Sequence, residues 1–206
     1  FYDEWYPDFR WGALTTLSNS IGQGEILVTP IQIANMMAAV ANKGYYFTPH
    51  IIKSISGDSI DRRFRKKNEV KIDKKYFNQI ELGLLNVYKT GTAKLLKVNN
   101  IEICGKSGTV ENFTKINGKK TQLTDHSIFV AYAPKDKPKI AISVLVENGH
   151  YGSKWAGMIA SLMIEKYLKG EVSNIEMESR VKKKNLKSEY IKPFLNRPFT
   201  INSNIE

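Results

Sequence analysis

The most informative segment of this chain is Ile101-Glu102-Ile103-Cys104-Gly105-Lys106-Ser107-Gly108-Thr109-Val110-Glu111-Asn112. Its apolar first part, residues 101–104, predicts a short strand. The strand leads into a polar tetrapeptide at residues 106–109, which consists of a lysine, a hydroxyl residue, a glycine and a second hydroxyl residue. The pattern therefore predicts that a strand edge presents one cation and two hydroxyl groups side by side.

The sequence around this stretch predicts further strands and helices. Strands are expected at residues 50–56, from Ser127 to Tyr132 and from Ile140 to Glu147, and residues 113–124, with Asn117-Gly118 at their centre, predict a hairpin turn. Helices are expected from Pro30, capped by Thr29 with Gln32 three residues later, from Asp73 through Tyr88, and from near Ser153 to Gly170. Strands with short connections followed by a helix predict the α+β class, with an antiparallel sheet packed with helices.

Length and charge limit the kind of protein this chain can be. With 206 residues, it is long enough for one well-packed domain, and we assign residues 1–170 to it. Residues 171–206 are polar and basic and are interpreted as a tail or a loosely docked C-terminal extension. The formal net charge of +11 could indicate nucleic acid. No zinc-ligand pairs or RNA-binding aromatic motif accompany the charge, so we expect solvated basic surfaces and no nucleic-acid partner.

The sequence does not predict a metal site or a disulfide. Cys104 is the single cysteine, which excludes an internal disulfide, and its apolar strand predicts a packing role. His50, His126 and His150 are widely spaced and form no metal-ligand motif. The longest apolar run, around residues 31–41, is interrupted by polar residues and is too short to span a bilayer.

The polar tetrapeptide suits acyl transfer. This reaction needs donors aimed at a developing oxyanion and a cation that holds an anionic substrate. A strand edge offers unpaired N–H groups at fixed positions, and Gly108 allows a substrate to approach the backbone closely. A second match, Lys89-Thr90-Gly91-Thr92, follows a predicted helix rather than a strand and is therefore interpreted as a decoy.

Several segments resemble one family in the order in which that family has them. They are Lys106 to Thr109, which matches a signature shared by serine β-lactamases and penicillin-binding proteins, together with Ser20 to Gly24, Val28 to Ala34, Gly91 to Ala93, Asp125 to Pro134 and Val146 to Gly149. The chain therefore resembles the C-terminal part of the transpeptidase domain of class B penicillin-binding proteins. Within that family it is most similar to the elongation-type group, often called penicillin-binding protein 2.

The resemblance implies a reaction and a set of roles. A serine would attack the D-Ala-D-Ala bond of a peptidoglycan stem peptide, and β-lactams would trap the same serine. Lys106 would stabilise the proton relay, Ser107 and Thr109 would bind the substrate carboxylate beside Gly108, and the Thr109 N–H would complete the oxyanion hole. The resemblance implies no metal or cofactor. It implies cell-wall elongation proteins as partners, and a place on the extracytoplasmic (periplasmic) face of the cytoplasmic membrane through an anchor outside this sequence.

Two other signatures of the family are not found in this sequence. The nucleophile signature, serine followed three residues later by lysine, matches only Ser179-Arg180-Val181-Lys182, in the charged extension on the wrong side of Lys106. The signature serine-x-asparagine does not occur. We therefore expect the nucleophile in an upstream part of the same domain, and an isolated chain that is inactive and prone to aggregate. The alternative is a non-catalytic module that binds stem peptides or cell-wall assembly partners.

Overall fold

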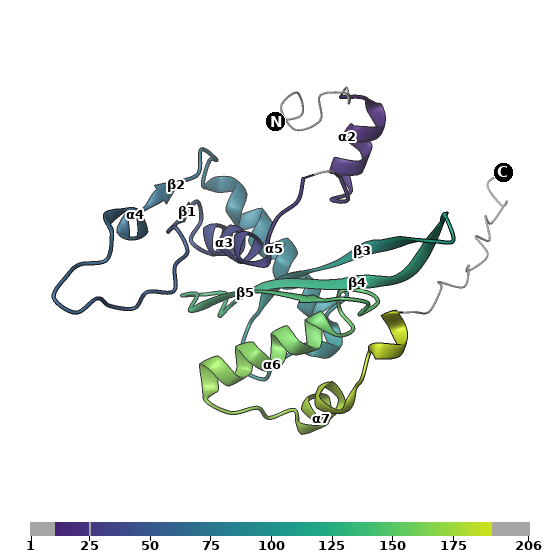
Figure 1. Ribbon diagram of the computed structural model, residues 1–206. Coiled ribbons are helices and arrows are strands. Elements are labelled where there is room, and N and C mark those ends of the chain that lie inside the picture. Colours follow the sequence, from purple (N-terminus) through teal and green to yellow (C-terminus); the bar gives the residue numbers. More distant parts are fainter. Residues whose placement is uncertain (1–10, 25, 191–206) are drawn as a thin grey trace, which may run out of the picture.

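The computed structural model describes residues 11–24 and 26–190 (Figure 1). The helices are α2 (Ala13–Ser20), α3 (Pro30–Ala41), α4 (Arg62–Arg65), α5 (Lys75–Lys89), α6 (Ala156–Lys169) and α7 (Ile175–Lys183), with two 3-10 turns, η1 (Lys94–Leu96) and η2 (Lys187–Tyr190). The strands are β1 (Tyr45–Tyr46), β2 (Asn68–Glu69), β3 (Cys104–Ile116), β4 (Lys119–Ala133) and β5 (Ile140–Val146).

The centre of the fold is an antiparallel sheet of the three consecutive strands β3, β4 and β5. β4 lies in the middle, which leaves β3 at one edge of this sheet. Helix α6 packs on one face of the sheet and α3 packs on the other, whereas α5 contacts β3 and contributes side chains to the cores on both faces (Figure 1). The predicted α+β class with an antiparallel sheet and packed helices is confirmed.

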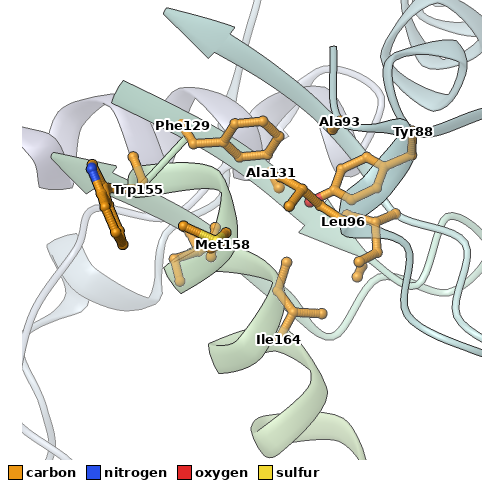
Figure 2. Close-up of a cluster of buried hydrophobic side chains, with 13 residues drawn as sticks. Tyr88, Ala93, Leu96, Phe129, Ala131, Trp155, Met158 and Ile164 are labelled. Atoms are coloured by element: carbon orange, nitrogen blue, oxygen red, sulfur yellow. The ribbon is translucent and has the colours of Figure 1, made fainter. Parts of the chain in front are cut away.

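Side chains from the two faces of the sheet pack into two separate apolar cores. Under α6, Phe129 and Ala131 are fully buried, and the Phe129 ring meets the Tyr88 ring edge-on with 5.8 Å between centroids (Figure 2). On the opposite face, Cys104 and Tyr132 are fully buried against residues of α3 and α5. The period-2 alternation of a strand explains why neighbouring residues enter different cores.

β4 carries a bulge opposite Glu111, close to the tetrapeptide Lys106 to Thr109. Val110 pairs with His126 and Asn112 pairs with Leu123, so Thr124 and Asp125 of β4 oppose the single residue Glu111 of β3. Beyond the bulge the hairpin turns at Asn117 and Gly118, whose φ angles of 51° and 76° lie in the left-handed region. Such angles favour asparagine and glycine, so the predicted turn is confirmed at its centre, while the flanking residues 113–116 and 119–124 belong to the paired strands.

The predicted helix ends are also present. The Thr29 N–H donates to Gln32 Oε1 at 2.7 Å, and Pro30 begins α3. Asp73 Oδ1 accepts from the Lys75 N–H at 3.0 Å at the start of α5. Gly170 ends α6 with a φ of 82°.

Three local predictions differ from the structure. Residues 50–56 form no strand apart from an isolated bridge between Ile55 and Asp58; Ile51 is fully exposed, and no strand of the described residues pairs with this segment. Strand β3 begins at Cys104 and not at Ile101, and it continues to Ile116. The tetrapeptide Lys106 to Thr109 therefore lies within the strand rather than after it. Helix α6 begins at Ala156, after a series of turns, and not at Ser153.

The first part of the predicted extension packs against the domain. Met177, Val181 and Leu186 contact the core under α6, and the Asn148 side chain donates to the Glu189 carbonyl at 3.3 Å. Residues 171–190 are therefore more firmly docked than a loose tail. The rest of the extension, residues 191–206, and residues 1–10 lie outside the described part of the chain.

The N-terminal part leaves apolar side chains exposed. Leu14 and Leu17 of α2 and Ile21 just after it are 60–80% exposed, and Leu27 is 88% exposed. An apolar surface of this kind marks a contact with another chain or segment. Of the helices in residues 11–24 and 26–190, none has the length and apolar character needed to cross a membrane.

Candidate active site

Strand β3 carries Lys106 to Thr109 along the free edge of the sheet. Ser107 pairs with Phe129 and Thr109 with Ser127, both of which face α6. Because side chains alternate along a strand, Ser107 and Thr109 share the α6 face and Lys106 projects from the other face. The strand therefore presents two hydroxyl groups on one side and a cation on the other.

Backbone N–H and C=O groups of β3 also point to the free edge of the sheet, where they can bind a ligand. The exposed Lys106 ammonium donates to the Ser107 carbonyl at 2.6 Å, and the Glu111 N–H donates to Gln23 Oε1 at 3.1 Å. Neither group is therefore used by β4. Backbone direction repeats every two residues in a strand, so the N–H of Thr109 points to the same edge. A reacting carbonyl placed there would meet an available donor.

Each hydroxyl of the tetrapeptide contacts a partner outside it. The Ser107 hydroxyl oxygen lies 2.9 Å from that of Thr92, and the Gly152 N–H donates to Thr109 Oγ1 at 3.3 Å. Thr92 follows α5, and Gly152 belongs to the turns that precede α6. The residues after α5 and the turns before α6 therefore each contact one hydroxyl group on the α6 face of β3.

The turn before α6 approaches the tetrapeptide so closely that it requires glycine. A Cβ atom on Gly152 would lie 2.4 Å from the carbonyl oxygens of Gly108 and Ile128 and 2.6 Å from the Gly108 nitrogen. The buried Ser127 fixes the same turn, because its hydroxyl donates to the Tyr151 carbonyl at 3.0 Å and accepts from the Ala156 N–H at 3.1 Å. The start of α6 and the tetrapeptide thus form one packed unit.

A shallow pocket opens beside Thr92, between the end of α5 and the start of α6. Residues of α7 and its N-cap complete the lining, which combines apolar side chains with two cations and one carboxylate: Thr92, Leu95, Leu96, Ser153, Lys154, Met158, Asn174, Glu176, Met177 and Arg180. Thr92 connects this pocket to the tetrapeptide, because its hydroxyl oxygen lies 2.9 Å from that of Ser107.

The decoy tetrapeptide, Lys89 to Thr92, does not lie on a strand as Lys106 to Thr109 does. Lys89 ends α5 and forms an exposed ion pair with Glu102 at 3.3 Å, away from the free edge. Thr92, however, lies within hydrogen-bond distance of Ser107. Sequence reasoning missed this contact, and the only signal for it was the family resemblance of Gly91 to Ala93 just before the signature.

The serine in the extension does not have the surroundings of a nucleophile. Ser179 lies in α7, and the Lys182 ammonium forms an exposed ion pair with Glu178 at 2.7 Å. A nucleophilic serine needs a base beside it, and here the lysine ammonium is directed to Glu178. Within the described part of the chain, this serine and lysine are not brought to β3.

His126, His150 and Cys104, which stand out in the sequence, have roles in packing or in backbone hydrogen bonding. His126 Nδ1 accepts from the Asn148 N–H at 3.0 Å, and the carbonyl of Asp125 accepts from the His150 N–H at 3.0 Å. Burial raises the pKa of the Cys104 thiol, which keeps it protonated and unreactive. Among the described residues, no group of three or more His, Cys, Asp or Glu is placed to hold a metal ion.

An antiparallel sheet between helices, with Lys-Ser-Gly-Thr on its free edge, defines the class of serine acyl-transfer domains that bind penicillin. The family described as the penicillin binding protein transpeptidase domain matches residues 3–165, and the chain belongs to this family. The predicted family is thereby confirmed.

Known relatives support the predicted subgroup. The chain is 33% identical to the peptidoglycan D,D-transpeptidase MrdA of Haemophilus influenzae over 181 residues, which are 81% of this chain and 28% of the relative. The structure of Pseudomonas aeruginosa PBP2 in complex with WCK 5153 superposes with a TM-score of 0.67 at 28% identity, over 93% of this chain and 38% of that one. The resemblance to penicillin-binding protein 2 is confirmed.

Two further structures show related proteins with ligands or partners. Penicillin-binding protein A of Mycobacterium tuberculosis, as an imipenem acyl-enzyme complex, matches with a TM-score of 0.58 at 25% identity, over 73% of this chain and 33% of that one. Helicobacter pylori PBP2, in complex with MreC, matches with a TM-score of 0.62 at 26% identity, over 81% and 30%. The chain thus spans well under half the length of the proteins that it matches.

Proposed function

We propose that this chain supplies the C-terminal part of the transpeptidase domain of a peptidoglycan D,D-transpeptidase. In this role it forms the wall of the active site that binds the substrate carboxylate and the oxyanion. The observation that carries the proposal is the placement of Lys106 to Thr109 on the free edge of β3, in a chain of the transpeptidase family.

The free edge suits the chemistry of acyl transfer. Ser107 and Thr109 offer two hydroxyl donors to the carboxylate of a D-Ala-D-Ala stem or of a β-lactam that mimics it. The Thr109 N–H stabilises the negative charge on the carbonyl oxygen while the serine attacks, and such a donor is worth about 10²–10³ in rate. Lys106 projects from the other face, but its ammonium reaches the free edge at the Ser107 carbonyl, where it would stabilise the proton relay.

The nucleophile would come from an upstream segment of the same domain. Ser179 and Lys182 are not placed beside β3, and the chain spans 28% of the length of its Haemophilus influenzae relative. The exposed apolar side chains of α2 and of the segment after it would pack against that upstream part. The active site then lies between the two halves of the domain.

The cellular role follows from the same resemblance. The name of the Haemophilus influenzae relative specifies peptidoglycan as its substrate, and the Helicobacter pylori neighbour was solved with MreC. We accordingly propose stem peptides as substrates, β-lactams as inhibitors and cell-wall elongation proteins as partners. Because peptidoglycan is assembled outside the cytoplasmic membrane, the domain would work on the extracytoplasmic side.

Intact mass after incubation with penicillin tests the proposal. The chain is measured alone and together with an upstream segment that bears serine-x-x-lysine. We expect no adduct on the chain alone and one acyl adduct on the upstream segment when both are present. An adduct on this chain alone would refute the assignment of the nucleophile, and no adduct in either sample would favour the non-catalytic module.

A pair of lysine variants sharpens this test. Lys106→Ala should lower the acylation rate constant of the paired halves by about 10²-fold or more, the range of a general acid or base. Lys89→Ala in the decoy is the matched control and should leave this rate constant unchanged. Equal rates for the two variants would show that Lys106 has no special role.

A further inference from the structure

A single hydrogen bond connects the end of α5 to the signature on β3. The hydroxyl oxygens of Thr92 and Ser107 lie 2.9 Å apart, although the two residues are separated by 15 positions in sequence. Thr92 lies outside the signature, at the last position of the decoy tetrapeptide. Its side chain is therefore placed against a residue that we propose to bind substrate.

The backbone around Thr92 is firmly held. The Gly91 N–H donates to the Asn86 carbonyl and the Ala93 N–H donates to the Val87 carbonyl, each at 2.9 Å. Ala93 is fully buried in the core under α6. The Thr92 hydroxyl is thus presented from the fixed end of a helix, which gives it a defined position relative to β3.

Hydrogen-bond chemistry sets the direction of this contact when a carboxylate is bound. A serine hydroxyl has one proton to donate and two lone pairs that accept. When Ser107 donates its proton to a carboxylate, its oxygen can only accept from Thr92. Thr92 then donates to Ser107, which donates to the ligand, and each bond in such a chain polarises the next.

Thr109 repeats the same arrangement two residues further along the strand. Its oxygen accepts from the Gly152 N–H at 3.3 Å, which leaves its own proton for a ligand on the same face. Both hydroxyl groups of the signature therefore have a donor behind them. The two donors differ, because the one behind Thr109 is a backbone group and the one behind Ser107 is the side chain of Thr92.

We propose that Thr92 is a positioning residue for ligand binding, which holds the Ser107 hydroxyl as a donor to the substrate carboxylate. This inference rests on the function proposed above, since it needs a carboxylate at Ser107. It assigns no chemical step to Thr92, which acts only through Ser107.

The test measures acylation by two penicillins in the chain paired with its upstream segment. Thr92→Val removes the hydroxyl while keeping the shape, and Thr92→Ser keeps the hydroxyl. With benzylpenicillin, we expect Thr92→Val to lower the acylation rate constant about three- to tenfold, the effect of one hydrogen bond, and Thr92→Ser to restore it. With the methyl ester of benzylpenicillin, which has no carboxylate, Thr92→Val should change the rate less than about twofold.

Thr90→Val provides the matched control. Thr90 lies in the same tetrapeptide, and its hydroxyl contacts only the Asn86 carbonyl among the described residues, at 3.5 Å. It should leave both rate constants unchanged. Thr92 is exposed, so its variants should fold like the parent, which the thermal unfolding temperature of each variant checks.

Two results would overturn the inference while the proposed function stands. One is an unchanged rate of Thr92→Val with benzylpenicillin, and the other is an equal loss with benzylpenicillin and with its ester, since a general structural effect would not depend on the carboxylate. Absence of any adduct in the parent pair would refute the proposed function, and the inference with it. This outcome is distinguishable because it is seen before any variant is made.

Discussion

Gly152 is the position where the packing against the signature leaves least room. An alanine there would bring its Cβ to 2.4 Å from two backbone carbonyl oxygens, those of Gly108 and Ile128. Both atoms belong to paired strands and cannot turn away as a flexible side chain would. The perturbation Gly152→Ala therefore tests how rigidly the turn before α6 is held on β3.

The size of the effect follows from these distances. To reach even 3.0 Å from these atoms, the shortest distance that real Cβ atoms show, the turn must retreat by 0.6 Å, which also breaks the 3.3 Å hydrogen bond from Gly152 to Thr109. Overpacking costs about 1–3 kcal/mol and a lost hydrogen bond about 1 kcal/mol, so we expect about 2–4 kcal/mol in total. For a chain of this size, that loss lowers the Tm by about 4–16 °C.

Thermal unfolding of the chain paired with its upstream segment measures this change. The rate of acylation by penicillin should fall too, because Thr109 is displaced. Gly83→Ala is the control: it lies within α5, nothing stands within 4 Å of its added Cβ, and the change should raise stability by about 0.5–1 kcal/mol. A Gly152→Ala protein as stable as its parent would show that the turn is not packed on β3 as described.

Three further results are expected. Desolvation raises the pKa of Glu165, but hydrogen bonds from Ser173 and the Lys169 ammonium outweigh it, so the pKa lies below its ordinary value of 4.5. The folded state therefore binds a proton less readily than the unfolded one, and the stability lost in Glu165→Gln, about 1–3 kcal/mol above pH 5, should shrink as the pH falls below 4.5 in denaturant titrations; a pH-independent difference would contradict this. Tyr88→Phe should cost about 1 kcal/mol by removing the buried 2.9 Å hydrogen bond to Ser161, and adding Ser161→Ala should cost less than the sum of the single changes in a double-mutant cycle. The chain without its upstream segment should aggregate on heating, because apolar side chains of α2 and of the segment after it are exposed. A sharp, reversible unfolding transition in calorimetry would contradict this expectation.

Local signals made much of the fold predictable. Thr29, Pro30 and Gln32 fix the start of α3 by rules that involve only neighbouring residues, and Asn117-Gly118 fixes the hairpin turn in the same way. Residues 50–56 have strand composition, but a strand also needs a partner, and the sequence gives no sign of whether one is present. The packing of residues 171–190 was missed for a similar reason, since a few apolar residues such as Met177 dock a helix that is otherwise charged.

The candidate site was only partly accessible to sequence reasoning. Lys106 to Thr109 form a contiguous motif, so their common place on one strand could be predicted, although their roles stay predictions. The contacts of Thr92 and Gly152 could not be predicted, because they depend on how a helix end and a turn pack in space. The same four-residue pattern at Lys89 shows that the motif alone does not identify the site; the neighbouring strands do.

The bulge in β4 divides the hairpin into a part that carries the signature and a tip. Two residues of β4, Thr124 and Asp125, oppose Glu111 alone, so the ladder beyond this point is out of phase with the ladder at Lys106 to Thr109. A single insertion in a regular hairpin turns every later side chain to the opposite face. Here the signature pairs with residues 127–130 of β4 on its own side of the bulge, so its two faces are set independently of the pairing at the tip. We therefore expect substitutions at Asn117 and Gly118 to change the hairpin tip without turning the side chains of Lys106 to Thr109.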